Sequence, residues 1–209
     1  MKNLKLFFIV AIFATLLFSS CGPDPKHQTP EEIGVLINGV IWSPYNVGKD
    51  GKFANSSVTK ACGLYQWNRN DTADFILEAE YLTSAFGTAN HWLPANDPSP
   101  KGWRVPTYYE LQTLLDTEKV SHEWVQESAS MRFTDIATGK SIFLPATGIK
   151  PCWSDGSIVG LVDKFGCYWS SNGFDYNNAG YLSFHFGNVL FTDLLFKASG
   201  VAIRPVADK

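Results

Sequence analysis

The cysteine at position 21 is the residue whose setting most clearly predicts a chemical modification. It follows the serine pair 19–20, which closes the apolar segment 6–18, and two lysines precede that segment. Its 13 residues are too few to span about 30 Å of hydrocarbon as a permanent helix, which needs about 20 residues. A short apolar run after positive charge is typical of a signal peptide. We therefore expect residues 1–20 to form a signal peptide that ends at Cys21.

Residues Leu17 to Gly22 resemble the bacterial lipoprotein box. The resemblance implies that Cys21 carries a thioether-linked diacylglycerol and becomes the first residue of the mature chain. Each buried methylene contributes about 0.8 kcal/mol, so two or three acyl chains hold a protein stably on a bilayer and one does not. The alternative is an ordinary cleaved signal followed by a chance cysteine.

The segment 21–32 is expected to be an extended tether between the membrane and the domain. It contains three prolines and shows no apolar periodicity, a composition typical of stiff linkers. The glycine after Cys21 resembles the sorting signal of outer-membrane lipoproteins. We therefore expect a cell-envelope protein anchored to the outer membrane by lipid, on its periplasmic or its outer side.

Three further cysteines, Cys62, Cys152 and Cys167, could form a disulfide. The number is odd for a chain in an oxidising compartment, so at least one thiol stays unpaired within it. A bond between Cys152 and Cys167 would close a short segment and add about 3 kcal/mol in the loop-entropy account. The alternative is that all three are reduced and pack as small apolar side chains.

The sequence offers no pattern for catalysis or metal binding. None of the four histidines stands at zinc-ligand spacing to another histidine or a cysteine, and neither a Gly-x-Ser-x-Gly elbow nor a P-loop occurs. We therefore assign no catalytic residue, no metal ligand and no cofactor.

The net charge of −3 becomes −5 without residues 1–20, with 15 basic and 20 acidic residues remaining. Because phosphate contacts need clustered Lys and Arg, this composition speaks against nucleic-acid binding.

A polar and aromatic stretch late in the chain has the composition of a binding loop. Tyrosine, asparagine and glycine combine large contact area with adaptable hydrogen bonding, as in antibody loops. The same residues favour turns, and the two roles are compatible. The candidate ligand-binding residues are Asn172, Phe174, Asp175, Tyr176, Asn177 and Asn178, with Asn188 in a second short loop.

The remaining chain, 33–209, predicts one domain of the α+β class. Its 45% hydrophobic share, in a 209-residue chain, can fill a core. Thr107 and Glu110 form a capping-box pattern that predicts a helix over 108–116, and apolar spacing favours a second helix over 71–86. An Asn-Gly pair predicts a hairpin within 35–42. Short strands are expected at 63–67, 141–145, 166–171, 179–186, 189–191 and 201–206, and a long loop at 90–106.

Four pieces in order carry a resemblance to a known family. They are Gly63–Trp67, Pro100–Thr107, Tyr168–Ser171 and Gly200–Val206. Together they look like the Fibrobacter succinogenes major paralogous domain, found in bacterial surface and secreted proteins that include many lipoproteins. The resemblance spans about residues 37–206. It implies a C-type-lectin-like fold, with one or two short helices and a mixed, mostly antiparallel set of short strands.

Several residues of these pieces, or of the helix they lead into, are expected to have structural roles. Pro106 holds its segment extended, and the residue before it is disfavoured from helical geometry. Trp103 and Trp169 are expected in the core. The full set of motif residues is Trp103, Arg104, Pro106, Thr107, Glu110, Tyr168 and Trp169.

The chain departs from the family at two positions. Many members have cysteines where this chain has Ser99 and Pro205, so the cross-link that the resemblance would imply is not expected. The copper-binding cysteine pair of the related sulfatase-modifying enzymes has no matching motif here. The calcium-binding triplets of sugar-binding lectins are also missing from the sequence.

We therefore expect a non-catalytic module that binds a protein or a glycan, for example in adhesion. One alternative is a structural component of a surface appendage. Another is an envelope enzyme that acts on polysaccharide, for which a cleft with close carboxylates of shifted pKa would be required.

Overall fold

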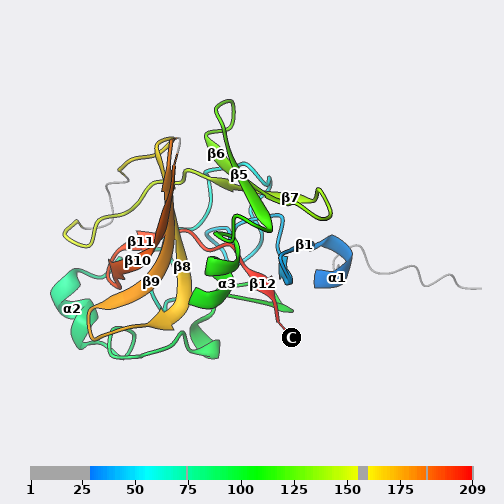
Figure 1. The fold of residues 1–209 in the computed structure, drawn as a ribbon. Helices are drawn as coiled ribbons and strands as arrows, with labels where there is room; N and C mark the ends of the chain where they lie inside the picture. Colours follow the sequence, from blue (N-terminus) through cyan, green and yellow to red (C-terminus); the bar gives the residue numbers. More distant parts are fainter. Residues whose placement is uncertain (1–28, 74, 155–159, 187, 209) are drawn as a thin grey trace, which may run out of the picture.

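Short antiparallel strands make up most of the regular structure, and a few short helices accompany them. The computed structural model describes residues 29–208 apart from 74, 155–159 and 187, and it describes the backbone alone at 188–192 (Figure 1). With 11% of the chain in helices, the fold belongs to the α+β class, as predicted. Among the described residues, no helix is both long enough and apolar enough to cross a membrane.

The strands form four small sheets, with the orders β1-β2-β12-β4, β5-β6-β7, β10-β9-β8 and β11-β3. Helix α3 packs against β8 and β9. The helices are α1 Pro30–Ile33, α2 Glu78–Thr83 and α3 Tyr108–Thr113, with the 3₁₀ turn η1 Pro94–Asn96. The strands are β1 Val35–Ile37, β2 Val40–Trp42, β3 Tyr65–Gln66, β4 Trp103–Arg104, β5 Val120–Val125, β6 Ser130–Asp135, β7 Ser141–Pro145, β8 Phe165–Gly173, β9 Asn178–His185, β10 Asn188–Phe196, β11 Gly200–Val201 and β12 Val206–Ala207.

The predicted hairpin is present as β1 and β2. Its turn residues, Asn38 and Gly39, have φ values of 42° and 80°, which asparagine and glycine adopt most readily. The Asn38 amide also donates to Asp135 Oδ2 at 2.9 Å, which joins the turn to β6.

The predicted helix at 108–116 is confirmed as α3, which ends at Thr113. The prediction of a helix over 71–86 is wrong for most of its length, because α2 is the only helical part among the residues of that range that the structure describes. The side chain of Gln66 accepts from the Ile76 amide at 2.9 Å and donates to its carbonyl at 2.7 Å. These bonds occupy backbone groups that a continuous helix would need.

In the late part of the chain, one strand is longer than predicted and another is split in two. The meander β8–β10 contains the expected segments, but β10 extends to Phe196 and not to 191. The expected strand at 201–206 is split into β11, which pairs with β3, and β12, which pairs with β2 and β4. The chain changes sheets at this point because residues 202–205 turn into the core, where the Arg204 side chain is fully buried.

Arg204 is surrounded by acceptors from three distant segments. Its guanidinium donates to Asn46 Oδ1 at 2.7 Å, to the Ser43 carbonyl at 3.0 Å and to the Phe143 carbonyl at 2.6 Å. A longer bond of 3.4 Å reaches the Ser57 carbonyl in the third segment. Burial lowers the pKa of Arg204 to about 10, so the group stays charged at neutral pH. The final residues are therefore fixed to the N-terminal hairpin and to β7 without a covalent link.

The three described cysteines are free and buried, and each lies in a different apolar cluster. The pairing of Cys152 with Cys167 is therefore not formed. Burial raises the pKa of Cys62 to about 11 and that of Cys167 to about 12. These thiols pack as small apolar groups, the alternative that the sequence left open.

Candidate functional site

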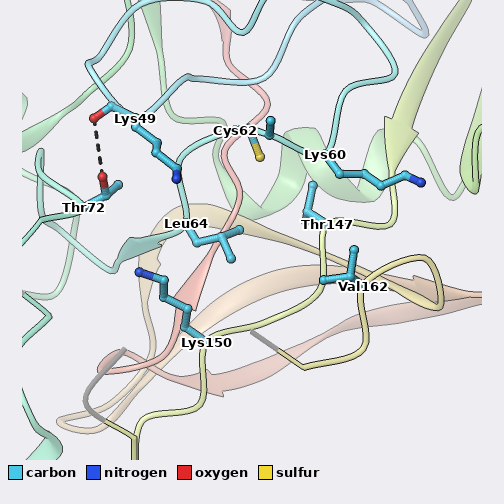
Figure 2. Close-up of a pocket in the computed structure, with 9 residues that line it drawn as sticks. Lys49, Lys60, Cys62, Leu64, Thr72, Thr147, Lys150 and Val162 are labelled. Atoms are coloured by element: carbon cyan, nitrogen blue, oxygen red, sulfur yellow. Dashed lines mark hydrogen bonds between the residues drawn. The ribbon is translucent and has the colours of Figure 1, made fainter. Parts of the chain in front are cut away.

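The described surface has hollows of about 280 to 330 Å³ over different parts of the fold. One is lined by lysines (Figure 2), and another lies beside the turn before α3. The third coincides with the polar and aromatic loop 172–178. This third hollow is the candidate ligand site, because the sequence pointed to the same loop.

The candidate site brings two separate segments together. Phe174, Asp175 and Tyr176 line one side of a hollow of about 280 Å³, and the segment 88–90 lines the other. The rings of Phe174 and Tyr176 are 52% and 54% exposed. The sequence indicated the first segment alone, since 88–90 carries no distinctive motif.

Asp175 organises the turn that carries these rings. Its Oδ1 accepts from the amides of Asn177 and Asn178 at 2.8 and 2.7 Å, and its Oδ2 accepts from Asn178 Nδ2 at 2.9 Å. The side-chain bond from Asn178, together with the backbone bonds, holds the pKa of Asp175 below its ordinary value. These polar groups therefore serve the turn, which is the second role that the sequence allowed them.

Asn172 and Tyr108 connect the candidate loop to helix α3. Asn172 Oδ1 accepts from the Tyr108 amide at 2.8 Å, and the Phe174 ring packs edge-on against the Tyr108 ring at 5.0 Å between centroids. On the opposite side, Tyr176 Oη donates to the Leu82 carbonyl at 2.6 Å. Contacts to α3 and to the end of α2 thus position both exposed rings.

Lys197 is a central residue of the site that the sequence reasoning missed. Its buried ammonium donates to the carbonyls of Gly87, Ala89 and Asp175 at 3.1, 2.7 and 2.9 Å, and it lies over the Trp67 ring at 4.7 Å. The Ala89 and Asp175 carbonyls belong to the two segments that line the hollow, and Gly87 lies directly before the first of them. The available signal in the sequence was that apolar residues stand on both sides of Lys197. A lysine in such a setting can be buried, and a buried lysine needs partners.

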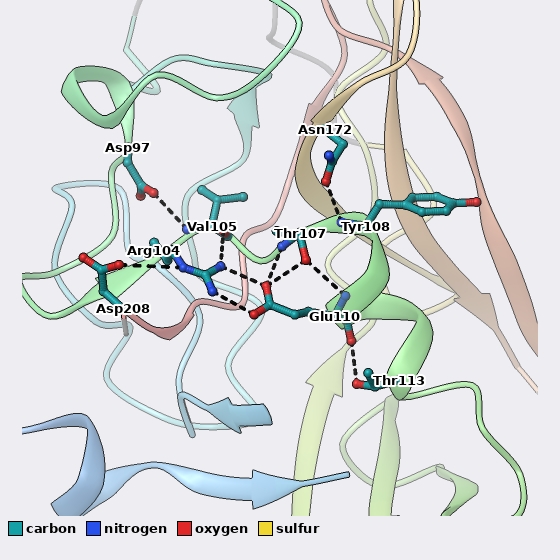
Figure 3. A network of polar contacts seen from close by, with 9 residues as sticks. All are labelled: Asp97, Arg104, Val105, Thr107, Tyr108, Glu110, Thr113, Asn172 and Asp208. Atoms are coloured by element: carbon teal, nitrogen blue, oxygen red, sulfur yellow. Dashed lines mark hydrogen bonds and ion pairs between the residues drawn. The ribbon is translucent and has the colours of Figure 1, made fainter. Parts of the chain in front are cut away.

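The motif before α3 forms a polar joint (Figure 3). Arg104 donates to both carboxylate oxygens of Glu110, at 2.7 and 2.8 Å, and lies 3.8 Å from Asp208. Glu110 also accepts from the Thr107 amide at 2.7 Å, while Thr107 Oγ1 accepts from the Glu110 amide at 3.2 Å. This is the capping box that the sequence predicted.

The joint changes the ionisation of Glu110 and fixes the neighbouring strand. Partial burial raises the pKa of Glu110, but the bonds from Arg104 and Thr107 outweigh burial, and the net pKa lies below the ordinary value. The carbonyl of Pro106 accepts from the Ser171 amide at 2.7 Å. The loop before α3 is thereby bound to β8, directly before the candidate loop.

The aromatic motif residues lie in the core. Trp103, Tyr168 and Trp169 are all buried. Tyr168 Oη donates to the Pro145 carbonyl at 2.7 Å, and Trp169 Nε1 donates to the Tyr65 carbonyl at 2.8 Å. Their contacts are internal, as expected for packing residues.

Two candidate residues lie beyond what the structure describes. Cys21 belongs to the segment 1–28, and the side chain of Asn188 falls within 188–192. Within the described ranges, no group of three His, Cys, Asp or Glu side chains is placed to hold a metal ion.

No protein-family model matches the chain, and no curated protein and no solved structure matches it significantly.

Proposed function

We propose that the mature chain is a non-catalytic binding module of the bacterial cell envelope. Its fold is of the C-type-lectin-like type, and it resembles the Fibrobacter succinogenes major paralogous domain. The ligand is a glycan or a protein that contacts the loop 172–178. The observation that supports this proposal is the pair of exposed rings, Phe174 and Tyr176, beside a hollow on a firmly supported loop.

The rings of Phe174 and Tyr176 are exposed and held in place by neighbouring helices. Exposed aromatic side chains that cluster at a hollow are typical of interaction sites. Their rings offer large contact area at a small cost in conformational entropy. The hydrogen bond from Tyr176 to Leu82 and the packing of Phe174 on Tyr108 fix both side chains before a ligand arrives. Pre-organisation of this kind favours binding.

Alanine at both Phe174 and Tyr176 is expected to weaken ligand binding by at least about tenfold, since aromatic anchors carry most of the energy of many interfaces. Stability should fall by only about 1–2 kcal/mol, because both rings are half-exposed. The measurement begins with glycan and protein arrays probed with the purified full chain. Dissociation constants for wild type and the double variant follow.

A matched control is Trp153→Ala, which removes a ring that is 77% exposed outside the hollow. It should leave the affinity unchanged. Equal affinities for the wild type and the Phe174/Tyr176 double variant would contradict the site. The absence of binding to every array component would contradict the proposed function.

A lipid on Cys21 anchors the binding module to the membrane in this proposal. Cys21 is acylated, and the tether holds the domain away from the outer membrane. The extended part of this tether ends before residue 32, where it was predicted to end, because Pro30–Ile33 form helix α1. Cys21→Ser is expected to move the protein from the membrane fraction to the aqueous fraction, since the acyl chains supply the membrane affinity. Mass spectrometry of the wild-type N-terminal peptide should show a lipid on residue 21.

Cys62→Ser is the matched control, because it replaces a thiol in the domain and leaves the anchor in place. Protease treatment of intact cells then identifies the side of the membrane, since only an outward-facing domain is cleaved. An unmodified thiol at Cys21, or a Cys21→Ser protein that stays in the membrane fraction, would refute the anchor.

A further inference from the structure

The hollow drawn in Figure 2 has a cluster of positive charge with no function in the fold described so far. It measures about 300 Å³, and its lining includes Lys49, Lys60 and Lys150 together with Leu64 and Thr147. The ammonium groups of Lys49 and Lys150 lie on the same side of Leu64, while Lys60 points away from them (Figure 2). It shares no lining residue with the hollow beside the loop 172–178.

The two converging lysines differ from Lys60 in their partners. Lys60 forms an ion pair with Asp163. Among the described residues, no carboxylate forms an ion pair with Lys49 or Lys150. Two carboxylates in the neighbouring segments are already used, since Asp50 pairs with Lys52 and Asp71 pairs with Arg69.

The same two lysines repel each other. The pKa of Lys150 lies below its ordinary value because of partial burial and because of the nearby charge of Lys49. Like charges held close together in a partly buried site are unfavourable until an opposite charge joins them. The Lys150 ammonium lies over the Phe75 ring, 5.5 Å from its centroid.

Thr147 provides an independent sign of a missing partner. Thr147 is 2% exposed, and its Oγ1 has no hydrogen-bond partner among the described residues. Buried hydroxyl groups are nearly always hydrogen-bonded, so an exception calls for an explanation such as a ligand or water. Thr147 belongs to the lining of the lysine hollow.

We propose that this hollow binds a small organic anion. Its carboxylate or phosphate group lies between Lys49 and Lys150, and its apolar side contacts Leu64 and Val162. A lysine ammonium is a compact point charge with three donors, which suits either oxyanion. The volume is at the lower end of the range for small-molecule sites, so the ligand is about the size of one or two sugar rings.

The test is calorimetric titration of the purified full chain in nonionic detergent at low ionic strength. The probes are glucuronate, glucose 1-phosphate and inorganic phosphate, with neutral glucose for comparison. We expect saturable binding of at least one sugar anion and none of glucose. The double variant Lys49→Gln/Lys150→Gln should weaken anion binding by at least about tenfold, because charge-assisted bonds to an oxyanion are strong.

The double variant Lys119→Gln/Lys140→Gln removes the same charge at exposed positions on the sheet β5–β7 and should bind as the wild type does. A site-specific readout comes from limited acetylation followed by mass spectrometry. The bound anion should protect Lys49 and Lys150 and leave Lys140 reactive. Thr147→Val should weaken binding severalfold without lowering the melting temperature, since it removes a hydroxyl that lacks a partner.

The arms of the titration separate the sources of the anion. Binding of glucuronate alone assigns a sugar carboxylate, and binding of glucose 1-phosphate alone assigns a sugar phosphate. Binding of inorganic phosphate alone would refute an organic ligand. The proposal is overturned if no anion binds saturably, if glucose binds equally well, or if the Lys49/Lys150 variant keeps the wild-type affinity. None of these outcomes bears on the loop 172–178.

Discussion

Replacing Arg204 with methionine is expected to lower the free energy of unfolding by about 3–5 kcal/mol, because it leaves several buried acceptors without donors. Methionine has a similar length but cannot donate to Asn46, to the Ser43 carbonyl or to the Phe143 carbonyl. For a domain of this size, the loss corresponds to a fall of about 10 °C in the melting temperature. Urea unfolding followed by tryptophan fluorescence measures the change.

Arg132→Met is the matched control, because Arg132 lies at the surface and pairs with Glu123. Its expected cost is below about 1 kcal/mol. Replacing a buried charge with an apolar side chain is sometimes neutral, because the charge no longer has to be desolvated. An Arg204→Met protein as stable as the wild type would show that this gain balances the lost hydrogen bonds, and the prediction would be wrong.

Lys197→Met is expected to lower stability by about 3 kcal/mol and to loosen the candidate ligand site. The variant removes three hydrogen bonds to carbonyls that lie on both sides of the hollow, and each buried acceptor left unpaired costs about 1 kcal/mol or more. Hydrogen exchange should speed up at the amides of Gly173 and Asn178, which bond within this region. The affinity of the Lys197→Met protein for the ligand should also fall.

The comparison for this variant is Lys140→Met, at an exposed turn between β6 and β7. It should change neither the stability nor the exchange rates by a measurable amount. Unchanged protection of the loop 172–178 in the Lys197→Met protein would mean that its own hydrogen bonds hold it, and that Lys197 serves the core alone.

Features that depend on neighbouring residues could be predicted from the sequence. The capping box of Thr107 and Glu110 and the Asn38-Gly39 turn are local arrangements, in which the residues that specify the structure lie within a few positions of one another. Both are present in the structure. The α+β class followed in the same way, from many short apolar runs and few helical ones.

Features that depend on distant partners could not be predicted. The helix expected over 71–86 is interrupted by Gln66, whose side chain occupies the backbone groups of Ile76. The last strand is divided because Arg204 reaches acceptors up to 161 positions away in the chain. No periodicity within either segment contains this information.

The candidate site shows the same division. The composition of 172–178 indicated one side of the hollow, whereas 88–90 joins it through Lys197, more than 100 positions away. The turn-forming bonds of Asp175 are local and were foreseeable from its Asn neighbours. The placement of the rings depends on contacts with α2 and α3. The sequence of 172–178 does not specify these contacts.

The position of β12 has a consequence for the biogenesis of the protein. Because β12 lies between β2 and β4, the first sheet cannot close until residue 207 has emerged from the ribosome. Contacts between the two ends of a chain form slowly. A nascent polypeptide whose first sheet stays open until then can still be threaded through a secretion channel, which suits the export that we propose.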